Sequence, residues 1–332
     1  MKKTLLLLTV FFTINASVLA DGLTATLQQG DQMKAFYGVD AFKQAYEAAN
    51  DGAVITLSSG EHNDVSTIEK SVTIIGAYAF DVKSPETTIL ASTTINANNV
   101  KIEGIYFSGT VTLGAVSDCQ IKRCWVEAEL TSMANHTNTL VDQCVIKKDK
   151  AIAKGHNYCI KNSTIYWFTG MNSSSNMAYI TNCVVWNWVT NDAASDQQPC
   201  GIYKNNILGI FIYSGNFYTP TNPSEFYYNV FLQIANSSSS KGVNENSECL
   251  KEGNYTNWLF EKYYSGGIYD YPAQDMKDGL IPLGQDGTPV GIMGGTGFSA
   301  YPSIPRIISR EIDSNTDDTG KLNVKITVQA QQ

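Results

Sequence analysis

The sequence predicts an all-β protein that folds as a right-handed parallel β-helix, a solenoid of stacked coils with a short N-terminal capping helix. A short motif recurs about every 20 residues through the middle of the chain. The recurring segments are rich in β-branched and aromatic residues and lack helical spacing. A short amphipathic segment precedes the first copy, and a solenoid needs such a cap because its terminal coil has no neighbour on one side.

The repeat has the pattern apolar-x-x-small or Asn-x-apolar. Six copies are separated by 20, 19, 20, 23 and 23 residues, with their centres at Cys124, Cys144, Ser163, Cys183, Asn206 and Asn229. Leucine-rich repeats have a similar length, but their Leu/Asn consensus is missing, and a propeller blade needs about 40 residues. A coil of two or three short strands fits the observed period, and such coils stack at the strand spacing of about 4.8 Å.

Stacking places each repeat position in a column that runs along the solenoid. The repeat centres form a column of small or amide side chains, in which Asn side chains can hydrogen-bond to one another. A second column is apolar and contains Val126, Ile146, Ile165, Val185, Leu208 and Phe231. A third contains Asn162, Asn182 and Asn205, and Asn tolerates the left-handed backbone that a sharp bend requires.

The seven cysteines are too few in so long a chain for a disulfide scaffold. Cys124 and Cys144 would lie one coil apart, within reach of a disulfide. We nevertheless expect the cysteines of the repeat to be small buried hydrophobic residues.

The N-terminus has the features of a signal peptide over residues 1–20. Lys2 and Lys3 precede an apolar run at 5–12, and Val18 and Ala20 are the small residues before a cleavage site. We expect export to the periplasm or the extracellular space, and no later stretch is apolar enough to span a membrane. Cleavage would change the formal net charge from −8 to −10, because two lysines are lost. This charge argues against a nucleic-acid partner.

The mature chain divides into two parts. Residues 21–300 are expected to form the β-helix, with a helix at about 40–50, a first strand at 53–57 and irregular C-terminal coils. On the predicted helix, Phe42, Ala45, Tyr46 and Ala49 share one face. Residues 301–332 form a tail, in which the alternating stretch 321–329 predicts a closing strand. We expect a monomer.

Several of these features resemble the pectin-lyase-like superfamily. They are the helix-then-strand opening at 40–60, the segment 71–76, the Asn-Cys/Ser turn repeat and the Gly-rich segment 286–295. The resemblance covers residues 40–300, and more narrowly the chain is similar to uncharacterised secreted β-helix proteins of Bacteroidota. It implies a fold but no single activity, because the superfamily includes lyases, hydrolases, esterases, adhesins and inert scaffolds.

The catalytic motifs that this resemblance suggests are missing. Glycoside hydrolysis needs paired carboxylates, and the adjacent pair Asp317–Asp318 lies in the tail rather than on a repeat coil. Gly155 and His156 match part of a Gly-His-Gly motif, but Asn157 follows them. The three histidines show no metal-ligand spacing. The sequence therefore predicts no catalytic set, no metal and no cofactor.

Isolated charged residues have simpler interpretations. Arg123 falls in the bend column, where we expect a solvated turn residue. Lys147 should stack beside Glu127 of the preceding coil as a charge pair. His62 and Asp64 are expected to form an exposed pair in a loop.

The candidate ligand-binding residues are Tyr166, Trp167, Trp186 and Asn187. Tyr166 and Trp186 share a column with Glu127 and Lys147, and this mixed polarity predicts an outward-facing column. Exposed rings one coil apart could stack on sugars, with Asn187 hydrogen-bonding; the alternative is that the rings fill the core. For Phe168, Trp188 and Phe211 the core is favoured.

The leading hypothesis is a carbohydrate-binding β-helix protein with a polysaccharide or other glycan as partner. The alternatives are a polysaccharide lyase or glycoside hydrolase with a diverged site, and a structural or adhesin-like surface protein.

Overall fold

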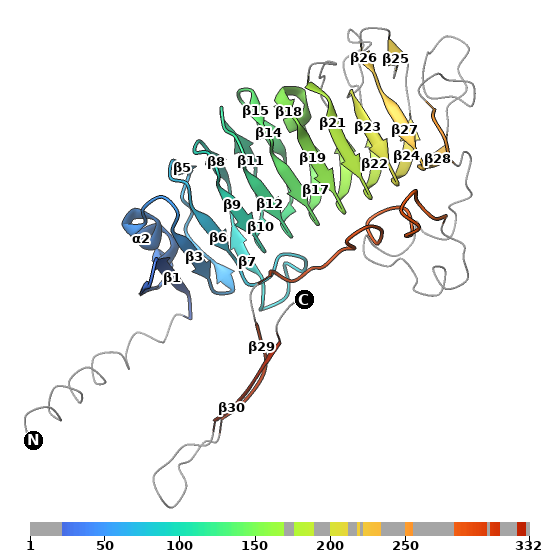
Figure 1. Ribbon diagram of the computed structural model, residues 1–332. Helices are drawn as coiled ribbons and strands as arrows, with labels where there is room; N and C mark the ends of the chain where they lie inside the picture. The colour runs from blue at the N-terminus through green and yellow to red at the C-terminus, as the bar shows by residue number, and fades with distance from the viewer. Residues whose placement is uncertain are drawn as a thin grey trace, which may run out of the picture.

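The computed structural model describes most of the chain between residues 22 and 329. The described residues are 22–168, 176–188, 200–211, 218–219, 222–233, 250–254, 282–303, 306–312 and 324–329. The predicted signal peptide therefore lies outside them, as does most of the segment from 234 to 281. The described residues form a right-handed parallel β-helix whose coils stack along one axis (Figure 1). This confirms the predicted fold class.

Two long sheets make the walls of the solenoid. Sheet A has eleven strands in the order β2(Gln32–Tyr37), β1(Thr24–Gln29), β3(Val54–Leu57), β6(Thr73–Ile75), β9(Lys101–Glu103), β12(Gln120–Lys122), β16(Leu140–Asp142), β19(Tyr158–Lys161), β21(Ala178–Thr181), β23(Gly201–Lys204) and β27(Glu225–Tyr227). From β3 onward every pairing in sheet A is parallel. Each of these strands therefore belongs to a new coil.

Sheet B has thirteen strands in two branches that meet at β17. One branch runs β28(Val230–Gln233), β24(Ile207–Phe211), β22(Val184–Trp188), β20(Thr164–Phe168), β17(Val145–Asp149), β13(Trp125–Val126), β10(Tyr106–Phe107), β7(Thr88–Leu90) and β4(Gly60–Glu61). The other continues from β17 through β14(Leu130–Ser132), β11(Val111–Leu113), β8(Thr93–Ile95) and β5(Thr67–Ile68). The long strands β17 and β20 thus run across the corner that separates the two branches in the earlier coils.

The remaining elements are small. β15(His136–Thr137) pairs with β18(Gly155–His156) just after the 3₁₀ turn η2(Ala151–Lys154), and β25(Tyr218–Thr219) pairs with β26(Asn222–Pro223). The stretch that predicted a closing strand contains β30(Val324–Gln329). It pairs with β29(Arg306–Ile312) in an antiparallel hairpin that extends away from the solenoid (Figure 1).

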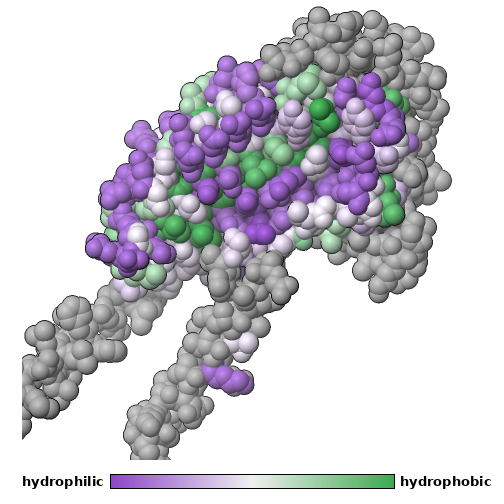
Figure 2. All heavy atoms as spheres, viewed as in Figure 1, coloured by the Kyte–Doolittle hydropathy of each residue, from purple (hydrophilic) through white to green (hydrophobic). Residues whose placement is uncertain are grey.

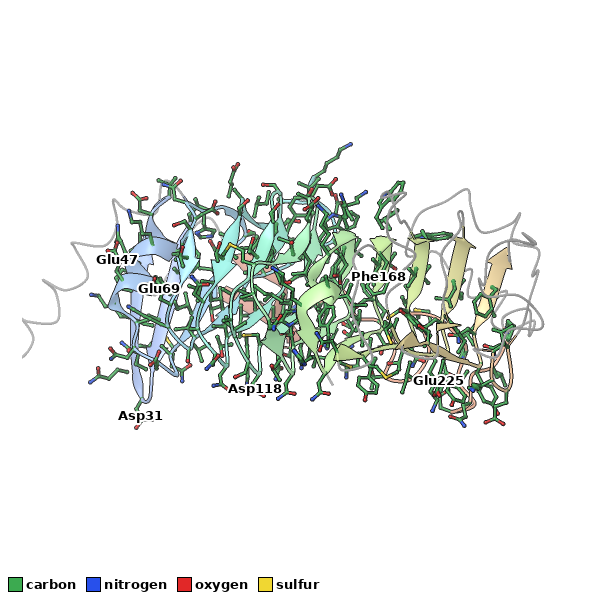
Figure 3. All side chains as sticks on the ribbon, turned by 90° about the horizontal axis from the view of Figure 1, so that it is seen from above. Asp31, Glu47, Glu69, Asp118, Phe168 and Glu225 are labelled. Atoms are coloured by element: carbon green, nitrogen blue, oxygen red, sulfur yellow. The ribbon has the colours of Figure 1, made fainter. Side chains whose placement is uncertain are left out.

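The N-terminal cap consists of a helix and a hairpin. The predicted helix is α2(Ala41–Ala48), and it buries Phe42 and Ala45 as expected. The strands β1 and β2 were not predicted; they pair antiparallel with each other and place β1 against β3. Asp31 marks the tip of this hairpin (Figure 3). The hairpin ends sheet A with an antiparallel pair, so no parallel coil is left open at this end.

The predicted columns form in the predicted register. The six repeat centres are all fully buried. Three of their side chains act as rungs between coils: Ser163 Oγ accepts the Cys144 N–H at 3.0 Å, Asn206 Oδ1 accepts the Cys183 N–H at 2.8 Å, and Asn229 Oδ1 accepts the Asn206 N–H at 2.9 Å. The cysteines that the structure describes are free thiols, as expected. The next column, from Val126 to Phe231, is buried and apolar.

The bend column precedes the repeat centres and has left-handed backbone throughout. Asn162, Asn182 and Asn205 have φ values of 45°, 52° and 56°. The same conformation occurs at Gly104, Arg123, Gln143 and Tyr228. Because only the local conformation is required, the position accepts several residue types, although Asn and Gly reach it at least cost.

The strap, defined as residues 282–303, returns along this bend column toward the N-terminal end (Figure 1). Asn205 Oδ1 accepts the Gln285 N–H at 2.9 Å, and Asn162 Nδ2 donates to Ile292 O at 3.0 Å and to Gly294 O at 2.6 Å. Farther along, Gln143 Oε1 accepts the Ser299 N–H at 3.2 Å, and Glu103 Oε1 accepts the Ser303 N–H at 2.7 Å. The bend side chains therefore bind a peptide segment as well as turning the coil.

Replacing Asn206 with Ala should destabilise the fold by about 2–4 kcal/mol. The change leaves the Cys183 N–H and the carbonyl of Ile180 without their partner in the buried column. Chemical denaturation of the variant and the wild type measures the loss.

Replacing Cys183 with Ser is the matched control in the same column. Ser163 already shows that this position accepts a hydroxyl, since its Oγ donates to Lys161 O at 2.7 Å. We expect C183S to lose less than half of what N206A loses. Equal losses would contradict a role for the amide rungs.

Candidate functional site

The candidate aromatic residues lie where β20 turns a corner. Ile165 and Phe168 are buried inside the stack, whereas Tyr166 is half-buried and Trp167 is exposed. The ladder between β17 and β20 keeps one register, with Ile146 aligned to Ile165 and Lys148 to Trp167, but it skips the pair Lys147 and Tyr166 between them. Two successive side chains therefore point outward, on different sides of the corner. Phe168, seen in Figure 3, is core as predicted.

Among the predicted site residues whose side chains the structure describes, Trp167 is the most open to solvent, with 45% of its surface exposed. In the ladder it lies between Lys148 of β17 and Asn187 of β22. The side chains of Asn187, Trp188 and Phe211 lie outside the described set. The indole is fixed by strands on both sides, so its face is presented without a flexible loop.

Lys148, the ladder neighbour of Trp167 on the N-terminal side, belongs to a small cluster of charged groups. Glu129 makes ion pairs with Lys148 at 3.1 Å and with Lys150 at 2.9 Å. Burial acts to raise the pKa of Glu129, but the hydrogen bonds from Lys150 and Lys148 outweigh it, and the pKa lies below its usual value. An exposed indole next to a lysine that is held by an ion pair is suited to a ligand that has both apolar and hydroxyl surfaces.

Tyr166 and Trp186 face outward but are largely covered. Tyr166 packs on an outer cluster with Trp125 and with Phe298 of the strap. Trp186 packs on a second outer cluster, which contains Val184 and the strap residues Val290 and Ile292. The predicted outward column is confirmed, but the strap and its neighbours occupy much of the ring surface. The structure thus separates Trp167 from the other two rings.

Three predictions about charged residues were wrong in detail. Lys147 and Glu127 form no ion pair: the Lys147 Nζ lies 4.4 Å from the centre of the Tyr166 ring, and Glu127 accepts a hydrogen bond from Trp125 Nε1. The aromatic rings hold the ammonium through cation–π contact. Arg123 is a turn residue, but its side chain is largely shielded from solvent, because Glu103 and Gln143 bind its guanidinium.

His62 is the third correction, since it is only 3% exposed. Its Nε2 lies 3.0 Å from Ser58 O, and burial lowers its pKa. Asp64 instead accepts hydrogen bonds from the backbone N–H groups of Ala91 and Ser92. His62 and Asp64 therefore form separate hydrogen bonds with backbone groups and do not pair with each other.

A buried polar network lies inside the coil stack and was not predicted. Asp149 accepts hydrogen bonds from Tyr158 Oη at 2.7 Å and from the Ala151 N–H at 2.8 Å. His136 lies edge-on to the Tyr158 ring, with Nε2 2.9 Å from Ala151 O and Nδ1 2.9 Å from Thr139 Oγ1. A carbonyl only accepts, so Nε2 carries the proton and Nδ1 accepts from Thr139. Burial raises the pKa of Asp149 to about 7 and lowers that of His136.

The sequence did contain a signal for this network. Asp149 lies 19 residues before Phe168, and the two align in the ladder. Phe168 belongs to a column that was predicted to be core, so the repeat places a carboxyl group inside the solenoid. The strap had no comparable signal, because its contacts depend on chain segments 80 to 200 residues apart.

Comparisons with known proteins add no relative. No family model, curated protein or solved structure matches the chain. The coil stack agrees with the fold that the pectin-lyase-like resemblance implies, and membership of that superfamily stays a prediction. Among the described residues, no helix is long and apolar enough to cross a membrane, and no group of His, Cys, Asp and Glu is arranged to hold a metal ion.

Replacing Asp149 with Asn should change how stability depends on pH. A raised pKa means that the Asp149 contribution is complete below pH about 4 and is lost as the pH rises to about 7. The free energy of unfolding of the wild type, relative to D149N, should fall between pH 5 and 7 by up to about 1.4 kcal/mol per pH unit.

The free energy of unfolding must be compared between wild type and D149N, because His136 changes the stability of both proteins with pH in the opposite direction. Its lowered pKa adds stability above pH about 6.5 that is lost on acidification. Both proteins share this effect, so it cancels. A wild-type-minus-D149N difference that does not change with pH would contradict the buried carboxyl.

Proposed function

We propose that this chain is an exported carbohydrate-binding β-helix protein and that Trp167 is the principal contact for the sugar. The observation that supports the proposal is the exposed indole of Trp167, held in a parallel ladder between Lys148 and Asn187. Sugar rings have apolar faces edged with hydroxyl groups, so they match an aromatic plane flanked by hydrogen-bonding groups.

Lys148, the ladder neighbour of Trp167, and the two charged residues clustered with it supply those groups. The ammonium groups of Lys148 and Lys150 are donors, and the Glu129 carboxylate is an acceptor. Tyr166 and Trp186 support the site from the other side of the corner, because their packing under the strap fixes β20 and β22. Asn187 follows Trp167 in the ladder on the C-terminal side.

The proposal is for binding without catalysis. The predicted signal peptide supports export, which would bring the chain to glycans of the periplasm or the extracellular space. Arg123 and Lys147, which could have been catalytic bases, are held by Glu103 and Gln143 and by aromatic rings respectively.

Replacing Trp167 with Ala should weaken glycan binding at least tenfold, about 1.4 kcal/mol, because the stacking plane is lost. The measurement is a glycan array with the purified protein, in which the same wells are assayed for new unsaturated or reducing ends.

Tyr179→Ala is the matched control, because Tyr179 is also an exposed ring, 41% open, but lies on sheet A. We expect this variant to bind as the wild type does. Binding that survives W167A, or is lost equally in Y179A, would refute the site. New chain ends would contradict the absence of catalysis.

A further inference from the structure

Threonine recurs at one outward position on four adjacent strands of sheet B. The aligned residues are Thr67 on β5, Thr94 on β8, Thr112 on β11 and Thr131 on β14. Figure 1 shows these strands one after another along one edge of the solenoid. All four side chains are partly exposed. Neighbouring members of this Thr row are therefore about 4.8 Å apart along the solenoid axis.

The hydroxyl groups of the Thr row are not used inside the protein. Among the described residues, none of the four hydroxyls donates or accepts a hydrogen bond. Inward-facing threonines of the same sheet differ, since Thr93 Oγ1 donates to Val65 O at 3.0 Å and Thr88 Oγ1 to Ser58 O at 2.9 Å. A hydroxyl can both donate and accept, so the row presents four such groups to whatever lies on it.

The strand preference of Thr does not by itself account for the row. One outward column of sheet A carries Thr73, Lys101, Gln120, Leu140 and Cys159 on five successive coils. Outward strand positions of this solenoid therefore accept many residue types. A uniform row is suited to a ligand that repeats along the axis, because each unit of the ligand meets the same group.

A second outward column joins the Thr row to Trp167. It lies two residues earlier along each strand and contains Ser92, Thr110, Glu129, Lys148 and Trp167. Ser92 Oγ accepts the Thr110 N–H at 3.0 Å, and Lys148 pairs with Glu129 at 3.1 Å. The two columns are about 7 Å apart. Together they form a strip, defined as these five residues and the Thr row.

The strip is close to neutral. On the coils of β8 and β11, both columns carry hydroxyl groups alone. Nearer to Trp167, the charges of Lys148 and Lys150 are both paired with Glu129. At the far end, the Asp64 carboxylate accepts the Ser92 N–H at 3.3 Å and adds a negative charge. An acidic polymer would therefore meet no cation on the hydroxyl coils and a like charge at their end.

We propose that the strip binds a neutral, unbranched polysaccharide chain that lies along the solenoid axis, with one sugar on each coil and its first sugar on Trp167. This inference rests on the proposed function and specifies the ligand class and the path of the chain. The path crosses six coils, from β20 to β5, a length of about 24 Å. An extended chain of β-1,4-linked pyranoses advances by nearly one coil spacing per sugar, so successive sugars meet equivalent positions.

Affinity at the strip depends on the length of the chain. The first sugar stacks on Trp167, and the next two lie over Lys148 and over Glu129 with Thr131. Only the fourth to sixth sugars reach the remaining hydroxyl groups of the strip. A single neutral hydrogen bond contributes little net free energy, so tight binding needs several coils.

Isothermal titration calorimetry with chains of three and six sugars tests this dependence. The probes are β-1,4-linked oligomers of glucose, mannose and xylose, with α-1,4-linked galacturonic acid oligomers as the acidic comparison. We expect at least one neutral hexasaccharide to bind at least tenfold more tightly than its trisaccharide, and more tightly than the acidic hexasaccharide.

The double variant T94V/T112V locates the extra affinity on the Thr row. It removes two hydroxyl groups and keeps β-branched residues that are suited to a strand. It should bind the neutral hexasaccharide about tenfold more weakly than the wild type and the trisaccharide equally well. T73V is the matched control, since Thr73 is also partly exposed on a strand but lies on sheet A. It should change neither affinity, whereas W167A should weaken both.

The outcomes separate the strip from the site at Trp167. Trisaccharide binding that is lost in W167A, with hexasaccharide binding unchanged in T94V/T112V, would overturn the strip and leave the Trp167 site standing. Tighter binding of the acidic hexasaccharide than of every neutral one would overturn the neutral ligand class. The absence of binding by every neutral hexasaccharide would also overturn the strip, and equal losses in T73V and T94V/T112V would show that the Thr row has no special role.

Discussion

The stacking of one coil on the next is the constraint on which the rest of the structure depends. A single coil is too small to bury its own apolar side chains, so the core exists only where identical positions align. Alignment is reinforced at three repeat centres, Ser163, Asn206 and Asn229, where a buried side-chain oxygen accepts the backbone N–H of the repeat centre on the preceding coil. These rungs tolerate little variation in register, because a shift of one residue would exchange the inner and outer side chains.

The same alignment determines what the outside of the protein presents. At the bend, the side chains of the left-handed residues lie in a line along the solenoid. The backbone of the strap forms hydrogen bonds with these side chains. Phe298, Val290 and Ile292 of the strap then cover the rings that precede the corner of sheet B. Beyond the corner, Trp167 stays open beside Lys148 of the preceding coil. Figure 2 shows a mostly hydrophilic surface with small apolar patches between the polar side chains. A surface of this kind offers localised contacts rather than one broad apolar face.

Much of this fold could be predicted because a solenoid converts sequence period directly into spatial neighbours. The columns of Cys124 to Asn229 and of Val126 to Phe231, and the bends at Asn162, Asn182 and Asn205, follow from the spacing alone. The antiparallel hairpin of β1 and β2 was missed because it lies outside the repeat. The strap was missed because its contacts are made across long sequence separations by backbone groups, which have no signature in side-chain identity.

The candidate site could be predicted only in part. Spacing placed Tyr166 and Trp186 in an outward column correctly, but it could not show that the strap packs beside them. It also placed Lys147 opposite Glu127 without showing that aromatic rings would hold the ammonium instead. The buried position of Asp149, by contrast, could have been predicted from the repeat period. Its alignment with Phe168 places a carboxyl group inside the core, where Tyr158 and the backbone donate hydrogen bonds to it.

Native-state hydrogen exchange tests the central claim, that side-chain rungs at the repeat centres hold the coils together, most directly. The amides of Cys144, Cys183 and Asn206 donate to side chains of the next coil rather than to backbone carbonyls. If the rungs hold the stack, these amides exchange as slowly as those of the buried strands and only through global unfolding. Fast exchange of these three amides while the strand amides stay protected would show that the rungs open locally, and it would contradict the account.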